Sequence, residues 1–139
     1  MLRIDLSFLL LAVACLLIGV MMGIGMGIAH NFQFAPVHAH LNLVGFVLLS
    51  VFGLTYKLYP ALQRSRLALP HLAASGLGAL MFPIGIYISI SREFPAVAIL
   101  GSLIVLGGVL LFAANLIWNV ALANSARRIA AEHVVPWAA

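Results

Sequence analysis

The chain has 139 residues, of which 65% are hydrophobic and only 7% are charged. Because average soluble domains are about half apolar and about a quarter charged, this composition excludes a water-soluble globule, and likewise a coiled coil, a collagen and a disordered chain. The formal net charge is +4, but the cations separate apolar stretches instead of clustering on one basic face, which argues against nucleic acid as a partner.

Three long stretches without charge indicate membrane spans. They hold 51, 25 and 33 residues and lie between Asp5 and Lys57, between Arg66 and Arg92, and between Glu93 and Arg127. A bilayer core of ~30 Å takes about 20 helical residues to cross, so the first stretch has room for two spans and the others for one each. We therefore predict an all-α fold, a polytopic bundle of four transmembrane helices in one domain over 1–139. Its spans are expected over 6–29, 37–58, 67–90 and 95–123, with a short cytoplasmic tail over 124–139.

The first span carries a stripe of glycines, Gly19, Gly23 and Gly27, one per helical turn. Small residues at this spacing let helices approach closely in lipid, so we expect the stripe to pack on another helix of the chain or on a second copy. Cys15 lies in the same span and is the only cysteine. An intrachain disulfide is therefore impossible, and Cys15 is expected to be a small core residue.

Polar residues and prolines punctuate the later spans. The segment 30–36 is expected to be a short external loop, with Pro36 in the first turn of the second span, where its missing N–H has no helical partner to lose. Asn115 and Asn119 lie one turn apart in the fourth span, and we expect interhelical hydrogen bonds from them. The three carboxylates lie outside the spans, so paired-carboxylate catalysis within the membrane is not expected.

The cations are distributed unevenly between the two sides of the membrane. Six of the seven lie before the first span, between the second and third, or after the fourth: Arg3, Lys57, Arg64, Arg66, Arg127 and Arg128. Only Arg92 lies on the other side of the membrane, between the third and fourth spans. Because cytoplasmic segments of membrane proteins are enriched in Lys and Arg, we predict that both termini are cytoplasmic. The chain is expected to be a multi-pass protein of a bacterial-type inner membrane.

Histidines are the side chains of this sequence best suited to bind a metal or a cofactor. Three of the five, His30, His38 and His40, fall within eleven residues at the outer ends of the first two spans. Ionisable residues at membrane depth are rare and usually functional, and imidazole is the commonest metal ligand. We predict that at least one of the three binds a metal or haem. His133 follows the last span and is expected to be exposed, whereas the sequence assigns no role to His71.

Helix geometry limits how these histidines combine. On a regular helix His38 and His40 point about 200° apart, so they cannot both face one metal unless His38 lies in the helix-opening turn. We expect one of them to bind the cofactor and the other to cap the helix, orient the ligand or line its approach. His40 and His71 should differ in depth by roughly 20 Å and therefore cannot both ligate one haem in the same subunit.

The stretch from His38 to Phe46, His-Ala-His-Leu-Asn-Leu-Val-Gly-Phe, is followed by Phe-Gly-Leu-Thr-Tyr ending at Tyr56. Over these roughly 20 residues the chain resembles the second-helix signature of the haem-copper oxidase subunit I superfamily. It is especially similar to small four-helix members and to the NnrS family of haem- and copper-containing membrane proteins. The resemblance implies that His40 ligates a haem, expected to be of b type, on a helix running from outside to inside. The charge distribution independently gives the second span this direction.

The resemblance implies a haem-binding integral membrane protein for electron transfer or for handling a diatomic gas such as NO or O2, with a possible redox partner. The oxidases take their second haem ligand from a late helix, and neither that histidine nor the copper-site histidines and catalytic tyrosine have a match here. Oxygen reduction by this chain alone is therefore not expected. Three ligand sets for the iron are expected alternatives. We favour His40 from each of two copies in a homodimer. The others are His40 with His30 or His38 in one subunit, and His40 alone with the iron open to a gas.

Two other functions fit the same residues. Met21, Met22 and Met26 lie near the histidines, and methionine with histidine suits copper(I), so a copper-binding membrane protein is one alternative. The other is a cofactor-free accessory or scaffold subunit of a membrane complex.

Overall fold

The computed structural model describes residues 3–133, with side chains described as far as Ser125. In chain order its helices are α1 (Ile4–Ala29), α2 (Ala35–His40), the π-helical segment η1 (Leu41–Leu48), α3 (Leu49–Leu58), α4 (Pro60–Gln63), α5 (Ala68–Arg92) and α6 (Ala96–His133). Within the described residues, four helical stretches are long and apolar enough to cross a membrane: Ile4–Ala29, Ala35–Leu58, Ala68–Arg92 and Ala96–Ser125. The predicted all-α fold with four membrane-spanning helices is confirmed.

The largest difference from the expected boundaries is at the end of α6. The predicted fourth span ends at residue 123, and the helix continues beyond it to His133, so residues 124–133 of the predicted tail are helical. Alanine is the strongest helix former, and this segment is rich in alanine and holds no glycine or proline before Pro136, so nothing in it stops the helix. At the start of the second span the prediction holds, because Pro36 lies in the first turn of α2.

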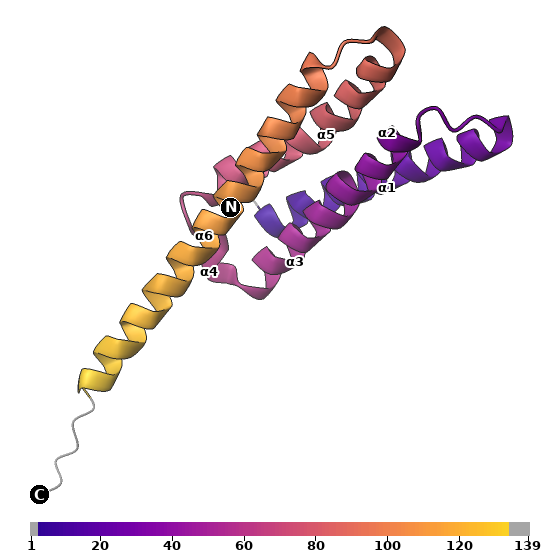
Figure 1. The fold of residues 1–139 in the computed structure, drawn as a ribbon. Coiled ribbons are helices and arrows are strands. Elements are labelled where there is room, and N and C mark those ends of the chain that lie inside the picture. The colour runs from indigo at the N-terminus through magenta and orange to yellow at the C-terminus, as the bar shows by residue number, and fades with distance from the viewer. Residues whose placement is uncertain (1–2, 134–139) are drawn as a thin grey trace, which may run out of the picture.

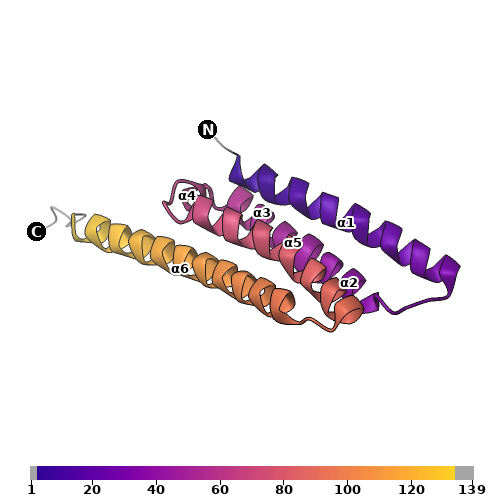
Figure 2. The ribbon, with the colours of Figure 1, turned by 90° about the horizontal axis from the view of Figure 1, so that it is seen from above.

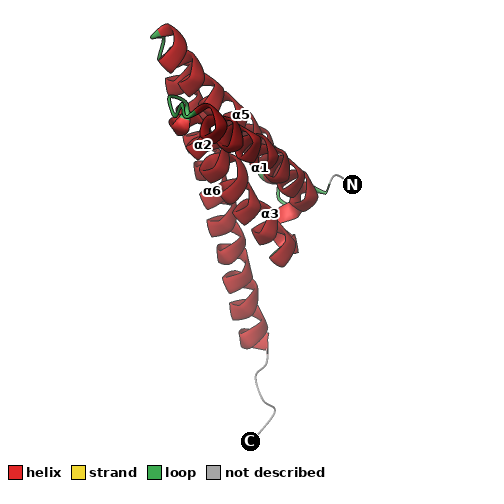
Figure 3. Cartoon of the chain, turned by 90° about the vertical axis from the view of Figure 1, so that its right-hand side faces the viewer, coloured by secondary structure: helices red, strands yellow, loops and turns green. Residues whose placement is uncertain are grey.

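The spans form two antiparallel hairpins, α1 with α2–η1–α3 and α5 with α6 (Figure 1). Viewed from above, α1 and α6 lie on opposite flanks, and α3 and α5 lie between them (Figure 2). The start of α1 lies at the same end of the molecule as α4, and α6 extends beyond that end (Figures 1 and 3). Since α6 packs mainly on α5, with a smaller contact to α4, much of its surface faces outward.

Two glycines of the α1 stripe bring α1 and the second span together. A methyl group on Gly19 would lie 2.9 Å from the side-chain amide of Asn42, and one on Gly23 would lie 2.9 Å from the His38 ring. From the other side, a methyl group on Gly45 would lie 2.6 Å from the β-carbon of Cys15. The stripe therefore serves packing within the chain at these positions, and Cys15 is a buried core residue as expected.

The α5–α6 hairpin is held together by glycines at seven-residue spacing on both helices. Gly78 and Gly85 of α5 face the backbone of α6, and Gly101 of α6 faces the backbone of Phe82. A β-carbon on Gly85 would overlap the backbone of Ala98. The absence of side chains at these positions lets the two backbones meet directly, which supplies the van der Waals packing that drives helix association in lipid.

Candidate functional site

The imidazole of His38 is fixed against α1. Its Nδ1 lies 2.8 Å from the carbonyl oxygen of Gly19, and because a carbonyl only accepts, we place the ring proton on Nδ1. The ring fills the notch at Gly23, with Nε2 3.7 Å from where a β-carbon would stand. One turn on, the amide of Asn42 donates to the His38 carbonyl over 2.8 Å. His38 thus joins α1 to α2, with Cε1 closest to Gly23 and Nε2 3.4 Å from the amide nitrogen of Asn42.

His40 is oriented by its own helix and faces α5. Its Nδ1 lies 2.7 Å from the carbonyl oxygen of Pro36, one turn earlier, so Nδ1 carries the proton and Nε2 carries a lone pair. The ring packs edge-to-face on Phe82, with centroids 4.7 Å apart. Within residues 3–125 no hydrogen bond reaches His40 Nε2. Metal-ligating histidines have this arrangement, since a hydrogen bond from the second nitrogen fixes the tautomer and the ring.

The eight residues directly after His40 form the π-helical segment η1, Leu41–Leu48. This segment could not be predicted from the sequence, because its pattern of apolar residues is also compatible with an α-helix. π-Helical turns are rare and are found frequently at functional sites. Asn42 and Gly45 share the face of His38, and both lie against α1. The wider π-helical turns therefore begin directly after the two histidines, of which His38 contacts α1 and His40 contacts α5.

His30 lies apart from this pair. It ends α1 in the left-handed conformation, with φ of 48°, and its side chain is exposed. The methionines near it diverge, because Met21 is 64% exposed while Met22 turns into a groove between helices. In the part of the chain that the structure describes, no group of three or more His, Cys, Asp or Glu side chains could hold a metal ion. The copper alternative stays a prediction.

The groove beside Met22 has a volume of about 270 Å³ and an entirely apolar lining. Its walls come from α1, from Val37 and Leu41 of the second span, and from Pro83 and Tyr87 of α5. These residues flank the two histidines in sequence, but neither His38 nor His40 lines the groove. The groove and the histidines therefore occupy different faces of the second span.

His71, to which the sequence assigned no role, lies at the centre of the core and is fully buried. Four aromatic rings surround its imidazole, with centroid distances of 4.9 Å to Phe8, 4.5 Å to Phe52, 5.6 Å to Tyr56 and 5.3 Å to Phe112. Because these rings come from α1, α3 and α6, His71 on α5 is a point where all four spans meet.

A chain of hydrogen bonds connects this imidazole to α6. The amide of Asn115 donates to the Tyr56 hydroxyl over 3.0 Å and to the Leu62 carbonyl over 3.3 Å. The Tyr56 hydroxyl lies 3.0 Å from His71 Nδ1, and because it already accepts from Asn115, we assign its own proton to the bond with His71. That places the ring proton of a neutral His71 on Nε2, which has no hydrogen-bond partner among the described residues.

The asparagines behave partly as expected. Asn115 bonds across to α3 and α4, whereas Asn119 donates within its own helix to Asn115. Tyr56 and His71 were not singled out as a pair, because residues 15 positions apart in different spans carry no periodic signal. The signal that could have identified them is their position inside membrane spans. Unsatisfied polar groups are costly there, so Tyr56, His71 and Asn115 are expected to form hydrogen bonds with one another.

Comparison with models of known protein families, with curated proteins and with solved structures gave no match for this chain.

Proposed function

We propose that this chain is a haem-binding membrane protein in which His40 is the protein ligand to the iron. The observation that carries the proposal is the state of the His40 ring. Its Nδ1 proton is donated to the Pro36 carbonyl, and its partly exposed ring has no hydrogen bond at Nε2 among residues 3–125. Neutral imidazole with one nitrogen held and the other available is the form that binds iron.

The other histidines fit this role less well. The His38 ring fills the notch at Gly23 and its Nε2 lies 3.4 Å from the amide nitrogen of Asn42, so a bound group there would have to displace Asn42. His71 has no open space beside it, because four aromatic rings enclose it. Phe82, which contacts His40, is 11 residues from His71 along α5, or about 16 Å, which agrees with the expectation that these two histidines do not share one haem.

In this proposal His40 contributes one imidazole to the iron. A haem held by it would supply one-electron transfer or the binding of a diatomic gas. Since His38 and His40 face different helices, a second imidazole would come from His30 or from His40 of another copy. The dimer stays a prediction, and Gly19 and Gly23 do not argue for it because both are used within the chain.

The visible spectrum of detergent-purified protein tests the proposal. We expect a Soret band that shifts on reduction, and we expect His40→Gly to lose haem because the iron loses its ligand. Adding free imidazole to His40→Gly should restore the band, because imidazole can enter the space that the deleted side chain leaves. A residue that only supported the fold would not be rescued in this way.

His133→Ala is the matched control, because the sequence places His133 beyond the fourth span; its side chain lies outside the described ones. This variant should retain full haem. Purified protein with no Soret band, even after haemin is added, would contradict the proposal and favour a cofactor-free scaffold. Metal analysis of that same sample would show copper if the copper alternative is correct.

A further inference from the structure

The end of the molecule that carries most cations has a cavity of about 520 Å³ between the α4–α5 turn and α6. Its lining is mixed: Arg64, Ser65 and Arg66 come from the turn, and Trp118, Asn119 and Leu122 come from α6. Asn115 anchors α6 to the Leu62 carbonyl of α4. The cavity therefore opens one turn further along α6 than this anchor, where the two elements diverge.

The charge in this cavity is uncompensated among the described side chains. Arg64 and Arg66 form no ion pair, and the one ion pair within residues 3–125 joins Arg3 to Asp5 at 3.0 Å. Asp5 lies on α1 and lines neither this cavity nor the neighbouring one. Glu93, the other acid with a described side chain, lies between α5 and α6 at the opposite end of α5. Among the side chains described up to Ser125, the cavity thus offers an anion two arginines and no carboxylate.

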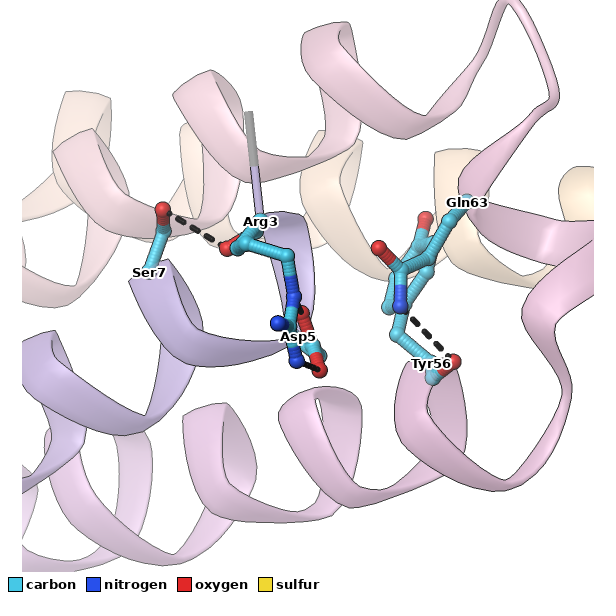
Figure 4. A network of polar contacts seen from close by, with 5 residues as sticks. All are labelled: Arg3, Asp5, Ser7, Tyr56 and Gln63. Carbon is cyan, nitrogen blue, oxygen red and sulfur yellow. Dashed lines mark hydrogen bonds and ion pairs between the residues drawn. The ribbon is translucent and has the colours of Figure 1, made fainter. Parts of the chain in front are cut away.

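A second cavity on the other side of Arg64 is a weaker candidate. It holds about 610 Å³ and is lined by Arg3, Gln63 and Arg64 among others. Arg3 is already neutralised, since Asp5 accepts from both Nε and Nη2, and these hydrogen bonds raise the pKa of Arg3 above its ordinary value. Gln63 is also engaged, because its amide donates to the Tyr56 carbonyl over 3.2 Å (Figure 4).

We propose that the cavity between the α4–α5 turn and α6 binds the headgroup of an anionic phospholipid, with Arg64 and Arg66 on the phosphate. Guanidinium groups suit phosphate oxygens because they present paired N–H donors. Trp118 is 63% exposed and Leu122 is 54% exposed, so the α6 wall offers an interfacial indole and an apolar surface for the acyl chains. A basic pocket between helices at the cytoplasmic surface is the kind of site that recognises such headgroups.

The lipid would join elements that make little direct contact. α6 packs mainly on α5 and touches α4 only slightly. A phosphate bridging the turn and α6 would therefore hold the outer part of α6 in place. Asn119, which lines the cavity, also donates to Asn115, so the bound lipid would adjoin the hydrogen-bond chain that ends at His71.

Quenching of Trp118 fluorescence by lipids with brominated acyl chains tests this proposal. The chain has two tryptophans, so Trp137→Phe leaves Trp118 as the only tryptophan, whose emission is separated from that of tyrosine by selective excitation of the indole. In phosphatidylcholine micelles, brominated phosphatidylglycerol should quench Trp118 at lower lipid fractions than brominated phosphatidylcholine does. Each arginine replaced by glutamine should reduce this preference roughly five-fold, and Arg64→Gln with Arg66→Gln should remove most of it.

Arg92→Gln is the control, because it removes a cation from the other end of α5 and should leave the preference unchanged. If Arg64→Gln/Arg66→Gln retains the full preference for phosphatidylglycerol, the lipid site is wrong. Inorganic phosphate should displace the brominated phosphatidylglycerol no better than chloride does at equal ionic strength. If free phosphate displaces it as well as unlabelled phosphatidylglycerol does, the cavity is a simple anion site and the proposal is overturned. Quenching by phosphatidylcholine verifies that each variant still presents Trp118 to lipid.

Discussion

Replacing His71 by alanine is expected to destabilise the protein by about 3–5 kcal/mol, which is the range for removing a large buried ring. The imidazole contacts aromatic rings from three other helices, so its loss opens a cavity that no single helix movement can close. It also removes the acceptor of the Tyr56 hydroxyl proton, so a buried O–H donor is left unsatisfied although the oxygen still accepts from Asn115. Unfolding in mixed micelles with increasing SDS, followed by circular dichroism, would measure the change.

His71→Phe separates packing from hydrogen bonding. This variant keeps an aromatic ring and eliminates the buried Nε2 that lacks a partner, while Tyr56 loses its acceptor. Because these two effects oppose each other, we expect a loss much smaller than that of His71→Ala. A double-mutant cycle with Tyr56→Phe should give a coupling of about 0.5–2 kcal/mol, as is found for interhelical hydrogen bonds in membranes. If His71→Phe destabilises the protein as much as His71→Ala does, aromatic packing is not the main contribution of His71.

Replacing Gly85 by alanine is expected to have the second-largest effect, a loss of about 2–3 kcal/mol. A β-carbon at Gly85 would overlap the backbone of Ala98, and a backbone cannot turn aside as a flexible side chain can. The hairpin would therefore have to separate along its length, which also weakens the contact of Gly101 with Phe82. The same SDS titration, read by near-ultraviolet circular dichroism, would detect loosened packing before helix is lost.

Gly107→Ala is the matched control for this substitution. Gly107 lies on α6, and a β-carbon there would meet no described atom within 4 Å. Since alanine is favoured over glycine in a helix by about 1 kcal/mol, this variant should be as stable as the parent or more so. If Gly85→Ala and Gly107→Ala behave alike, close backbone contact is not what holds α5 to α6.

Part of the candidate site was predictable because it depends on local geometry. The two-residue spacing of His38 and His40 already separated them onto different faces of the second span, and the structure places them against α1 and α5. The spacing did not decide which histidine keeps a free nitrogen. That depends on Gly23, whose missing side chain makes room for the ring of His38, and on the Pro36 carbonyl beneath His40.

The sequence alone determined that the chain crosses a membrane four times as helices. Apolar length is a property of consecutive residues, and a backbone in lipid must satisfy its hydrogen bonds within each span. Only the tertiary structure decided which polar groups meet. Tyr56, His71 and Asn115 become one hydrogen-bonded unit because three spans bring them to the same depth and rotation, and helix rotation is fixed by packing between helices. The same holds for Arg64 and Trp118, which share a cavity only because α6 passes the α4–α5 turn.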